Sequence, residues 1–194
     1  PLQNVYSRER IPFDGWVTIK SDANFRSPKR VLSGINELLA LSPAIASCSP
    51  IEGGDVEVLT YENQGELIPR TVEALDRSLE LGFEPRHVAL LSFRGRESSS
   101  LTPFTQIGKH TLRSPIQGKY DEFGNPEYSE GEITTDSVHR FKGQAAPCVV
   151  LTEIDFVKLD ENSKIRIFVG ATRATMKLIL VISKRSLEIL LQRA

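Results

Sequence analysis

Residues 148–152 read Cys-Val-Val-Leu-Thr, and residues 177–183 read Lys-Leu-Ile-Leu-Val-Ile-Ser. Both runs are short, apolar and rich in β-branched side chains, which is typical of strands buried on both faces. The residues between them repeat apolar or small side chains at helical spacing, at Ile165, Phe168, Val169 and Thr172. A buried strand, a helix and a second buried strand form a parallel unit, so this stretch predicts an α/β fold.

The upstream sequence continues the alternation of strands and helices. Strands are expected at 16–19, 56–60, 87–92 and 133–138, and helices at 28–42 and 69–81, with a short C-terminal helix from Ser186. For the first helix, Ser27 is the expected cap and Pro28 the first helical residue. The elements together predict a parallel sheet with helices on both faces, in which ligands bind where the strands end.

Residues 94–132 interrupt this pattern. Gly, Pro, Ser and charged residues dominate there, and no period of a strand or helix persists. A structureless stretch of this length is unusual as a plain connection, so we expect a long irregular loop with a functional or mobile role.

Composition excludes several classes of protein. The 24 Lys+Arg and 25 Asp+Glu residues give a net charge of −1, so no large basic field indicates nucleic acid. No apolar run approaches the roughly 18 residues that a membrane span needs. The two cysteines, Cys48 and Cys148, are far apart, which excludes a disulfide framework and favours a reducing cytoplasm. We expect a cytoplasmic protein with no membrane partner and no metal site of its own.

Three short segments carry residues suited to phosphate chemistry. Phe25 and Arg26 offer a ring that can stack on a base and a guanidinium that can bind phosphate oxygens. His139 and Lys142 lie beside a glycine that permits close approach of an anion, and Arg173 follows a small-residue stretch. Each residue alone is ordinary: a surface arginine, a structural histidine or an interfacial ion pair. Their order and spacing are what distinguish this chain.

The three segments resemble the C-terminal motor domain of superfamily 1 DNA helicases of the UvrD/Rep type. Residues 24–27, Asn-Phe-Arg-Ser, are similar to motif IV of that family, and residues 137–145, Ser-Val-His-Arg-Phe-Lys-Gly-Gln-Ala, to motif V. Residues 168–174, Phe-Val-Gly-Ala-Thr-Arg-Ala, are similar to motif VI, which an apolar strand follows here as in the family.

The resemblance implies a RecA-like parallel sheet, a P-loop NTPase-type fold that lacks its own Walker A motif. Residues 1–194 would form one helicase C-terminal domain, and the N-terminal motor domain would lie elsewhere in a longer polypeptide. Neither Gly108-Lys109 nor Gly118-Lys119 has the surrounding residues that a Walker A motif needs. The fragment alone is therefore expected not to hydrolyse ATP.

The resemblance also assigns roles to individual residues. Arg173 and Arg26 would be the catalytic arginines, with Arg173 as the arginine finger. The ATP-binding residues would be Phe25, Arg26, Gly143, Gln144 and Arg173. The single-stranded DNA track would include Ser137, His139, Arg140 and Lys142. ATP and Mg²⁺ would be bound mainly by the other motor domain, which is the second implied partner besides single-stranded DNA.

One departure from the family pattern concerns motif V. The family has Leu-Glu where this chain has Gln144-Ala145, and the family glutamate accepts a hydrogen bond from the ribose. Three functions therefore stay open: half of an ATP-dependent DNA helicase or translocase, a non-catalytic relative that binds single strands or protein, and an unrelated nucleotide-binding α/β module. Three motifs that match in order disfavour the third. A Walker A lysine and an acidic metal motif upstream would decide for the first over the second, which Ala145 and the near-zero net charge slightly favour.

Overall fold

The computed structural model describes residues 24–192, so the strand expected at 16–19 lies outside the described residues. Within this range the main sheet has seven strands in the order β1-β9-β8-β2-β7-β4-β3. All neighbouring pairs are parallel except β3 and β4, which are antiparallel. The strands are β1 (Glu57–Tyr61), β2 (Val88–Ser92), β3 (Gln106–Ile107), β4 (His110–Arg113), β7 (Ile133–Ser137), β8 (Ala146–Ile154) and β9 (Ala174–Ser183).

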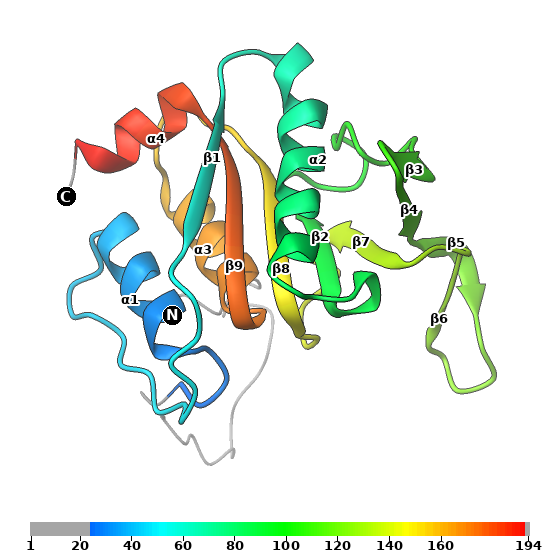
Figure 1. Cartoon of the computed structure of the whole chain (residues 1–194), viewed down its shortest axis with the longest axis horizontal. Coiled ribbons are helices and arrows are strands. Elements are labelled where there is room, and N and C mark those ends of the chain that lie inside the picture. The colour runs from blue at the N-terminus through cyan, green and yellow to red at the C-terminus, as the bar shows by residue number, and fades with distance from the viewer. Residues whose placement is uncertain (1–23, 193–194) are drawn as a thin grey trace, which may run out of the picture.

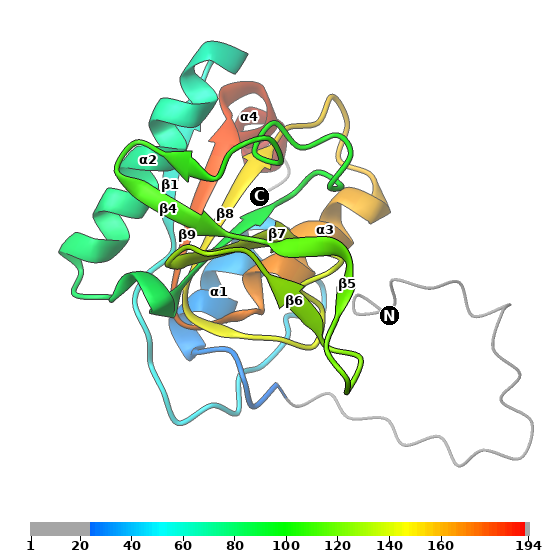
Figure 2. The same ribbon diagram turned by 90° about the vertical axis from the view of Figure 1, so that its right-hand side faces the viewer.

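Helices cover both faces of the sheet, and alternate residues of the central strands pack against each face. Val149 and Leu151 of β8 belong to the core under α1 (Lys29–Leu38), α3 (Glu161–Ala171) and α4 (Lys184–Leu191). Cys148 and Val150 belong to the core under α2 (Gln64–Glu80). Figure 1 and Figure 2 show α2 on one side of the sheet and α1 and α3 on the other. The predicted RecA-like α/β fold, with helices on both faces, is confirmed.

The beginnings of two helices differ from the prediction. Ser27 does not cap α1: Pro28 occupies the N-cap, and the buried Ser27 hydroxyl instead lies 3.5 Å from the carbonyl oxygen of Thr172. Helix α2 begins five residues earlier than expected, because the Asn63 side chain accepts a hydrogen bond from the backbone N–H of Gly65. Both differences arise from side-chain hydrogen bonds, which apolar spacing does not reveal. A short 3-10 turn, η2 (Pro85–His87), leads into β2.

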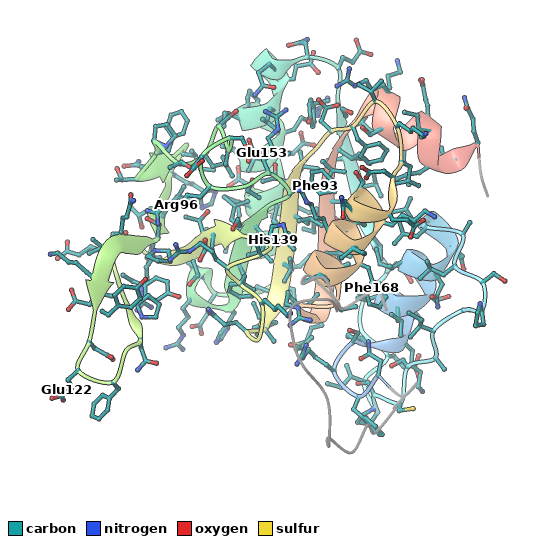
Figure 3. The ribbon with its side chains drawn as sticks, turned by 180° about the vertical axis from the view of Figure 1, so that it is seen from behind. Phe93, Arg96, Glu122, His139, Glu153 and Phe168 are labelled. Atoms are coloured by element: carbon teal, nitrogen blue, oxygen red, sulfur yellow. The ribbon has the colours of Figure 1, made fainter. Side chains whose placement is uncertain are left out.

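Residues 94–132 are not the long irregular loop that the sequence suggested. They contain β3 and β4 at the sheet edge, and then a separate hairpin of β5 (Pro115–Tyr120) and β6 (Pro126–Tyr128). Figure 3 shows Glu122 at the tip of this hairpin, away from the main sheet. Gly131 lets the chain pass close to β4, since a Cβ there would lie 2.5 Å from the Leu112 carbonyl oxygen. The strands are short and rich in Gly and Pro, so their pattern was too brief to recognise.

Across residues 24–192, no helix combines the length and the apolar character needed to cross a bilayer.

Candidate nucleotide and nucleic-acid site

The segments around Arg26 and Arg173 lie against each other. The Asn24 side chain accepts hydrogen bonds from the backbone N–H groups of Arg26 (3.0 Å) and Ser27 (2.9 Å), which forms a tight turn. The next contact is the one between the Ser27 hydroxyl and the Thr172 carbonyl oxygen. Arg26 and Arg173 therefore extend from neighbouring segments, although Ser27 and Thr172 lie 145 positions apart along the chain.

The Arg173 guanidinium is buried, with 5% of the residue exposed. Its Nε donates to the Val169 carbonyl (3.0 Å), Nη1 to the Gln144 carbonyl (3.4 Å) and Nη2 to the Thr172 hydroxyl (3.4 Å). Arginine has five N–H donors, so one on each terminal nitrogen is left over. Among residues 24–192, no carboxylate lies within ion-pair distance of Arg173. The arrangement leaves a buried cation with two donors for an anion.

Its surroundings make the charged form of Arg173 less favourable than it is in water. Burial and, to a smaller extent, the nearby positive charge of Arg26 together lower the pKa of Arg173 to about 10. At neutral pH the guanidinium nevertheless remains protonated. The carbonyl groups at the C-terminal end of α3 supply only partial negative charge, because helix ends carry about half an elementary charge.

Phe25 and Arg26 are both exposed, and Phe25 is 71% exposed. The two residues lie near the point where β9 begins, because Thr172 and Arg173 directly precede that strand. The arginine pair therefore does not follow a strand, as the sequence suggested, but gathers at the amino ends of β8 and β9. An exposed ring and two guanidinium groups here can bind a base and a phosphate chain.

Residues 137–145 run from the carboxyl end of β7 to the amino end of β8 and connect the two ends of the sheet. Val138 and Phe141 are buried in the core beneath α1 and α3, which fixes the path of the segment. Gly143 has φ +93 with open space around it, so the backbone conformation itself favours glycine there. The Gln144 carbonyl then accepts from Arg173. Gln144 therefore contacts the arginine through its backbone, and the Gln144 side chain is exposed.

Three of the four residues proposed for the DNA track lie on the outside of this segment. His139, Arg140 and Lys142 are exposed, whereas Ser137 is buried and its hydroxyl accepts from the Arg140 backbone N–H at 3.4 Å. Arg140 Nε lies 3.5 Å from Asp136 Oδ1. Burial lowers the pKa of His139, and the charges of Arg166 and Lys142 lower it further. The histidine is therefore neutral at pH 7 and can donate or accept a hydrogen bond.

Polar residues outside the three motifs also lie near residues 137–145. Arg166 of α3 lies over the Phe93 ring, 5.7 Å from its centroid. Asp136 and Arg96 line a cavity that also includes Ser137. The polar run of residues 134–137 in a strand with buried neighbours was a signal that could have identified Asp136. Arg96 had no such signal, because it lies in the segment with no recognised pattern.

The residues present fit the phosphate part of a nucleotide. Arg173 and Arg26 offer donors to an anion, as described above. Within residues 24–192, no group of three or more His, Cys, Asp or Glu side chains is arranged to hold a metal ion.

Comparison with known protein families concerns the segment that contains Arg173. Residues 132–181 match the UvrD-like helicase C-terminal domain family. This match confirms the resemblance to the UvrD-like helicase C-terminal domain that motifs V and VI indicated. The matched UvrD-like segment includes residues 137–145 and 168–174 completely, while Phe25 and Arg26 lie outside it. No curated protein sequence matches the chain.

A solved structure shares the architecture that carries the UvrD-like segment. It is the C-terminal domain of a possible DNA helicase from Lactobacillus plantarum WCFS1, and the superposition has a TM-score of 0.57. The alignment covers 82% of this chain and 87% of that one, at 14% sequence identity. At this identity the likeness concerns the fold, so the roles of individual residues depend on the geometry of this chain.

Proposed function

We propose that this chain is the second motor domain of an ATP-dependent DNA helicase or translocase. It completes the ATP site of a motor domain that carries the Walker A motif, and it contacts single-stranded DNA. The observation that carries the proposal is Arg173, a buried guanidinium with two spare donors and no carboxylate partner among residues 24–192.

The chemistry of phosphoryl transfer explains why such an arginine is useful. Negative charge spreads over the γ-phosphoryl oxygens as the bond to the leaving group breaks, and a fixed guanidinium stabilises that charge. The guanidinium is already desolvated and oriented by the Val169 and Gln144 carbonyls, so little reorganisation is required. Arginine fingers contribute roughly 10³–10⁵ to the rate where they have been measured.

Arg26 and Phe25 have separate roles in this proposal. Arg26 binds a phosphate oxygen next to Arg173, and repulsion between the two cations is relieved when an anion lies between them. Phe25 stacks on the adenine ring, which accounts for an aromatic side chain that is 71% exposed.

Residues 137–145 link the two proposed ligands. The segment presents His139, Arg140 and Lys142 to the DNA strand and ends at Gln144, whose carbonyl holds Arg173. A change in strand position can therefore alter the orientation of the arginine through a short, packed stretch of backbone. The proposal includes a cytoplasmic location and no membrane partner.

The test uses the natural polypeptide that contains this chain together with its Walker A-bearing domain. ATP hydrolysis in the presence of single-stranded DNA should fall by at least about 10³-fold in Arg173→Ala. Arg86→Ala is the matched control, because Arg86 is an exposed arginine whose only partner among the described residues is Glu84. Equal hydrolysis by Arg173→Ala and the wild type would disprove the finger assignment.

A second candidate is a non-catalytic relative that binds single strands or protein. The observation that favours it is Ala145, whose exposed side chain cannot accept the ribose hydrogen bond. In that case the natural polypeptide would bind single-stranded DNA but would not hydrolyse ATP.

A further inference from the structure

The β5–β6 hairpin extends away from the main sheet as a separate two-stranded unit (Figure 1). Residues 117–125 are all exposed, so the outer part of the hairpin adds no side chain to either hydrophobic core. A two-stranded hairpin by itself is only marginally stable in water. The contacts that hold this one lie at its base and within its tip.

The base of the hairpin is fixed to the edge of the main sheet. The Ser114 N–H donates to the Ser129 hydroxyl (3.0 Å), and the Ser129 N–H donates to the Ser114 carbonyl (2.9 Å). The Arg113 guanidinium carbon lies 4.8 Å from the centroid of the Tyr128 ring. Arg96 donates to the carbonyl of the first residue of β5 at 3.0 Å. These contacts give the hairpin a defined direction, which carries Glu122 away from the sheet (Figure 3).

The tip of the hairpin is held by the Asp121 carboxylate. It accepts from the backbone N–H groups of Phe123 (2.9 Å) and Asn125 (2.8 Å) and from the Asn125 side-chain amide (3.0 Å). The Asp121 N–H donates to the Asn125 carbonyl at 2.8 Å, and Gly124 takes the φ of +80 that the turn requires. The backbone that carries Phe123 is therefore ordered before any partner binds, which lowers the entropy cost of binding.

Two aromatic side chains of this ordered hairpin are left in solvent. Phe123 is 81% exposed and Tyr120 is 60% exposed. Neither ring belongs to a hydrophobic core, so folding does not account for an aromatic residue at either position. Aromatic side chains on a rigid support are the residues that carry much of the binding energy at protein–protein interfaces.

The charge around these rings selects the kind of partner. Residues 117–132 contain five carboxylates and one ammonium group, that of Lys119, in a chain of net charge −1. Four of the carboxylates form no ion pair and no side-chain hydrogen bond with any residue between 24 and 192, and these belong to Glu122, Glu127, Glu130 and Glu132. A phosphate backbone is repelled by this charge, and so is the equally acidic hairpin of a second copy. A protein surface that carries lysine and arginine is attracted.

We propose that the β5–β6 hairpin is a docking arm for another protein, with Phe123 inserted in an apolar pocket whose rim carries lysine or arginine side chains. The glutamates of the hairpin pair with that rim. This contact goes beyond the proposed function, because it requires neither a nucleotide nor single-stranded DNA.

The test uses the natural polypeptide and three labelled synthetic peptides of equal length as stand-ins for the partner surface, with binding measured by fluorescence anisotropy. One peptide combines leucine and lysine in an amphipathic helix, the second serine and lysine, and the third leucine and glutamate. The leucine–lysine peptide should bind at least about tenfold more tightly than either of the others, because it alone offers both apolar surface and positive charge. Equally tight binding of either of the other peptides would overturn the proposal.

Variants of the hairpin locate the contact. Phe123→Ser should weaken binding of the leucine–lysine peptide by at least about tenfold, and Glu122→Gln/Glu127→Gln by about threefold. Val157→Ser is the matched control, because Val157 is 78% exposed but lies between β8 and α3, and it should leave binding unchanged. Binding of the peptide by Phe123→Ser as tightly as by the wild type would overturn the proposal.

Two further measurements on Phe123→Ser test the other occupants of this surface. The variant and the wild type should bind single-stranded DNA equally and should sediment with the same mass. Weaker DNA binding by Phe123→Ser would assign the ring to nucleic acid, and dissociation of a wild-type oligomer would assign it to a second copy of this chain. Either result would overturn the proposal.

Discussion

At the scale of single residues, Arg173 is a buried cation with no carboxylate partner among residues 24–192. Burial lowers its pKa to about 10, so keeping it charged costs about 3 kcal/mol at pH 7. That cost is present below pH 10 and fades as the pH rises from 10 to 12.5, where the unfolded state also loses its proton. Its three hydrogen bonds offset a similar amount of free energy.

We therefore expect Arg173→Gln to leave thermal stability nearly unchanged while it abolishes ATP hydrolysis. The melting temperature should shift by less than about 4 °C, since 1 kcal/mol corresponds to about 2–4 °C in a chain of this size. Calorimetry of both proteins measures the shift. A fall of about 10 °C would show that Arg173 supports the fold, as the loss of one partner of a buried ion pair does.

The two cysteines provide a second prediction at this scale. Cys148 is buried in β8, and burial raises the pKa of its thiol to about 12, whereas Cys48 is exposed. A thiol reagent should therefore modify Cys48 of the native protein quickly, and Cys148 only when the protein unfolds. Mass spectrometry after labelling identifies the modified residue. Rapid labelling of Cys148 in native protein would contradict its place in the sheet.

At the scale of the element, Glu153 joins β8 to the segment after β2. Its φ of +62 places a non-glycine residue in the left-handed region, within an irregularity of the β8–β9 pairing. Glu153→Gln weakens the hydrogen bonds to Ser99 and Ser100, and we expect a loss of about 1–3 kcal/mol in the free energy of unfolding. Hydrogen exchange should become faster in residues 94–105 and stay unchanged in α2. Glu132→Gln, an exposed change, should alter neither quantity.

The sheet edge is tied to α2 by a charge cluster. Asp76 Oδ1 lies 2.8 Å from the Lys109 Nζ and 3.0 Å from the Nε2 of the buried His110. The hydrogen bond from Lys109 lowers the pKa of Asp76 most, and His110 lowers it further. Because the folded pKa is depressed, the stabilisation is present above the ordinary pKa of 3.8 and is lost as the pH falls through the lower folded value.

Denaturant unfolding of wild type and Asp76→Asn across acid pH tests this account. The wild type should be the more stable of the two at pH 6, and the difference should disappear as the pH falls below 3.8. A difference that stays constant down to pH 2 would show that the charge of Asp76 is not what ties β4 to α2.

Elements with long apolar runs could be predicted from the sequence, whereas the short ones could not. Residues 148–152 and 177–183 lie within β8 and β9, because burial on both faces requires continuous apolar side chains. The strands of residues 106–128 have two to six residues each, and partners within that segment or at the sheet edge stabilise them. The motifs likewise pointed to Arg173 as a candidate, whereas the cavity beside Asp136 depends on tertiary packing.

At the scale of the whole molecule, the two ends of the sheet carry different groups of residues. The arginine pair gathers at the amino ends of β8 and β9, and the cavity and Ser137 lie at the carboxyl ends of β2 and β7. Residues 137–145 cross between these ends beneath α1 and α3. In a nearly neutral chain, of net charge −1, the arginine pair is thus a local concentration of positive charge.

The most direct test of the account is a double-mutant cycle on Arg26 and Arg173, measured as ATP hydrolysis by the natural polypeptide. Two arginines that act on one phosphate chain should be coupled, so the loss in Arg26→Ala/Arg173→Ala should fall short of the product of the single losses by at least about fivefold. If instead the two losses multiply without coupling, or Arg26→Ala has no effect, the arginines do not act on a common phosphate group.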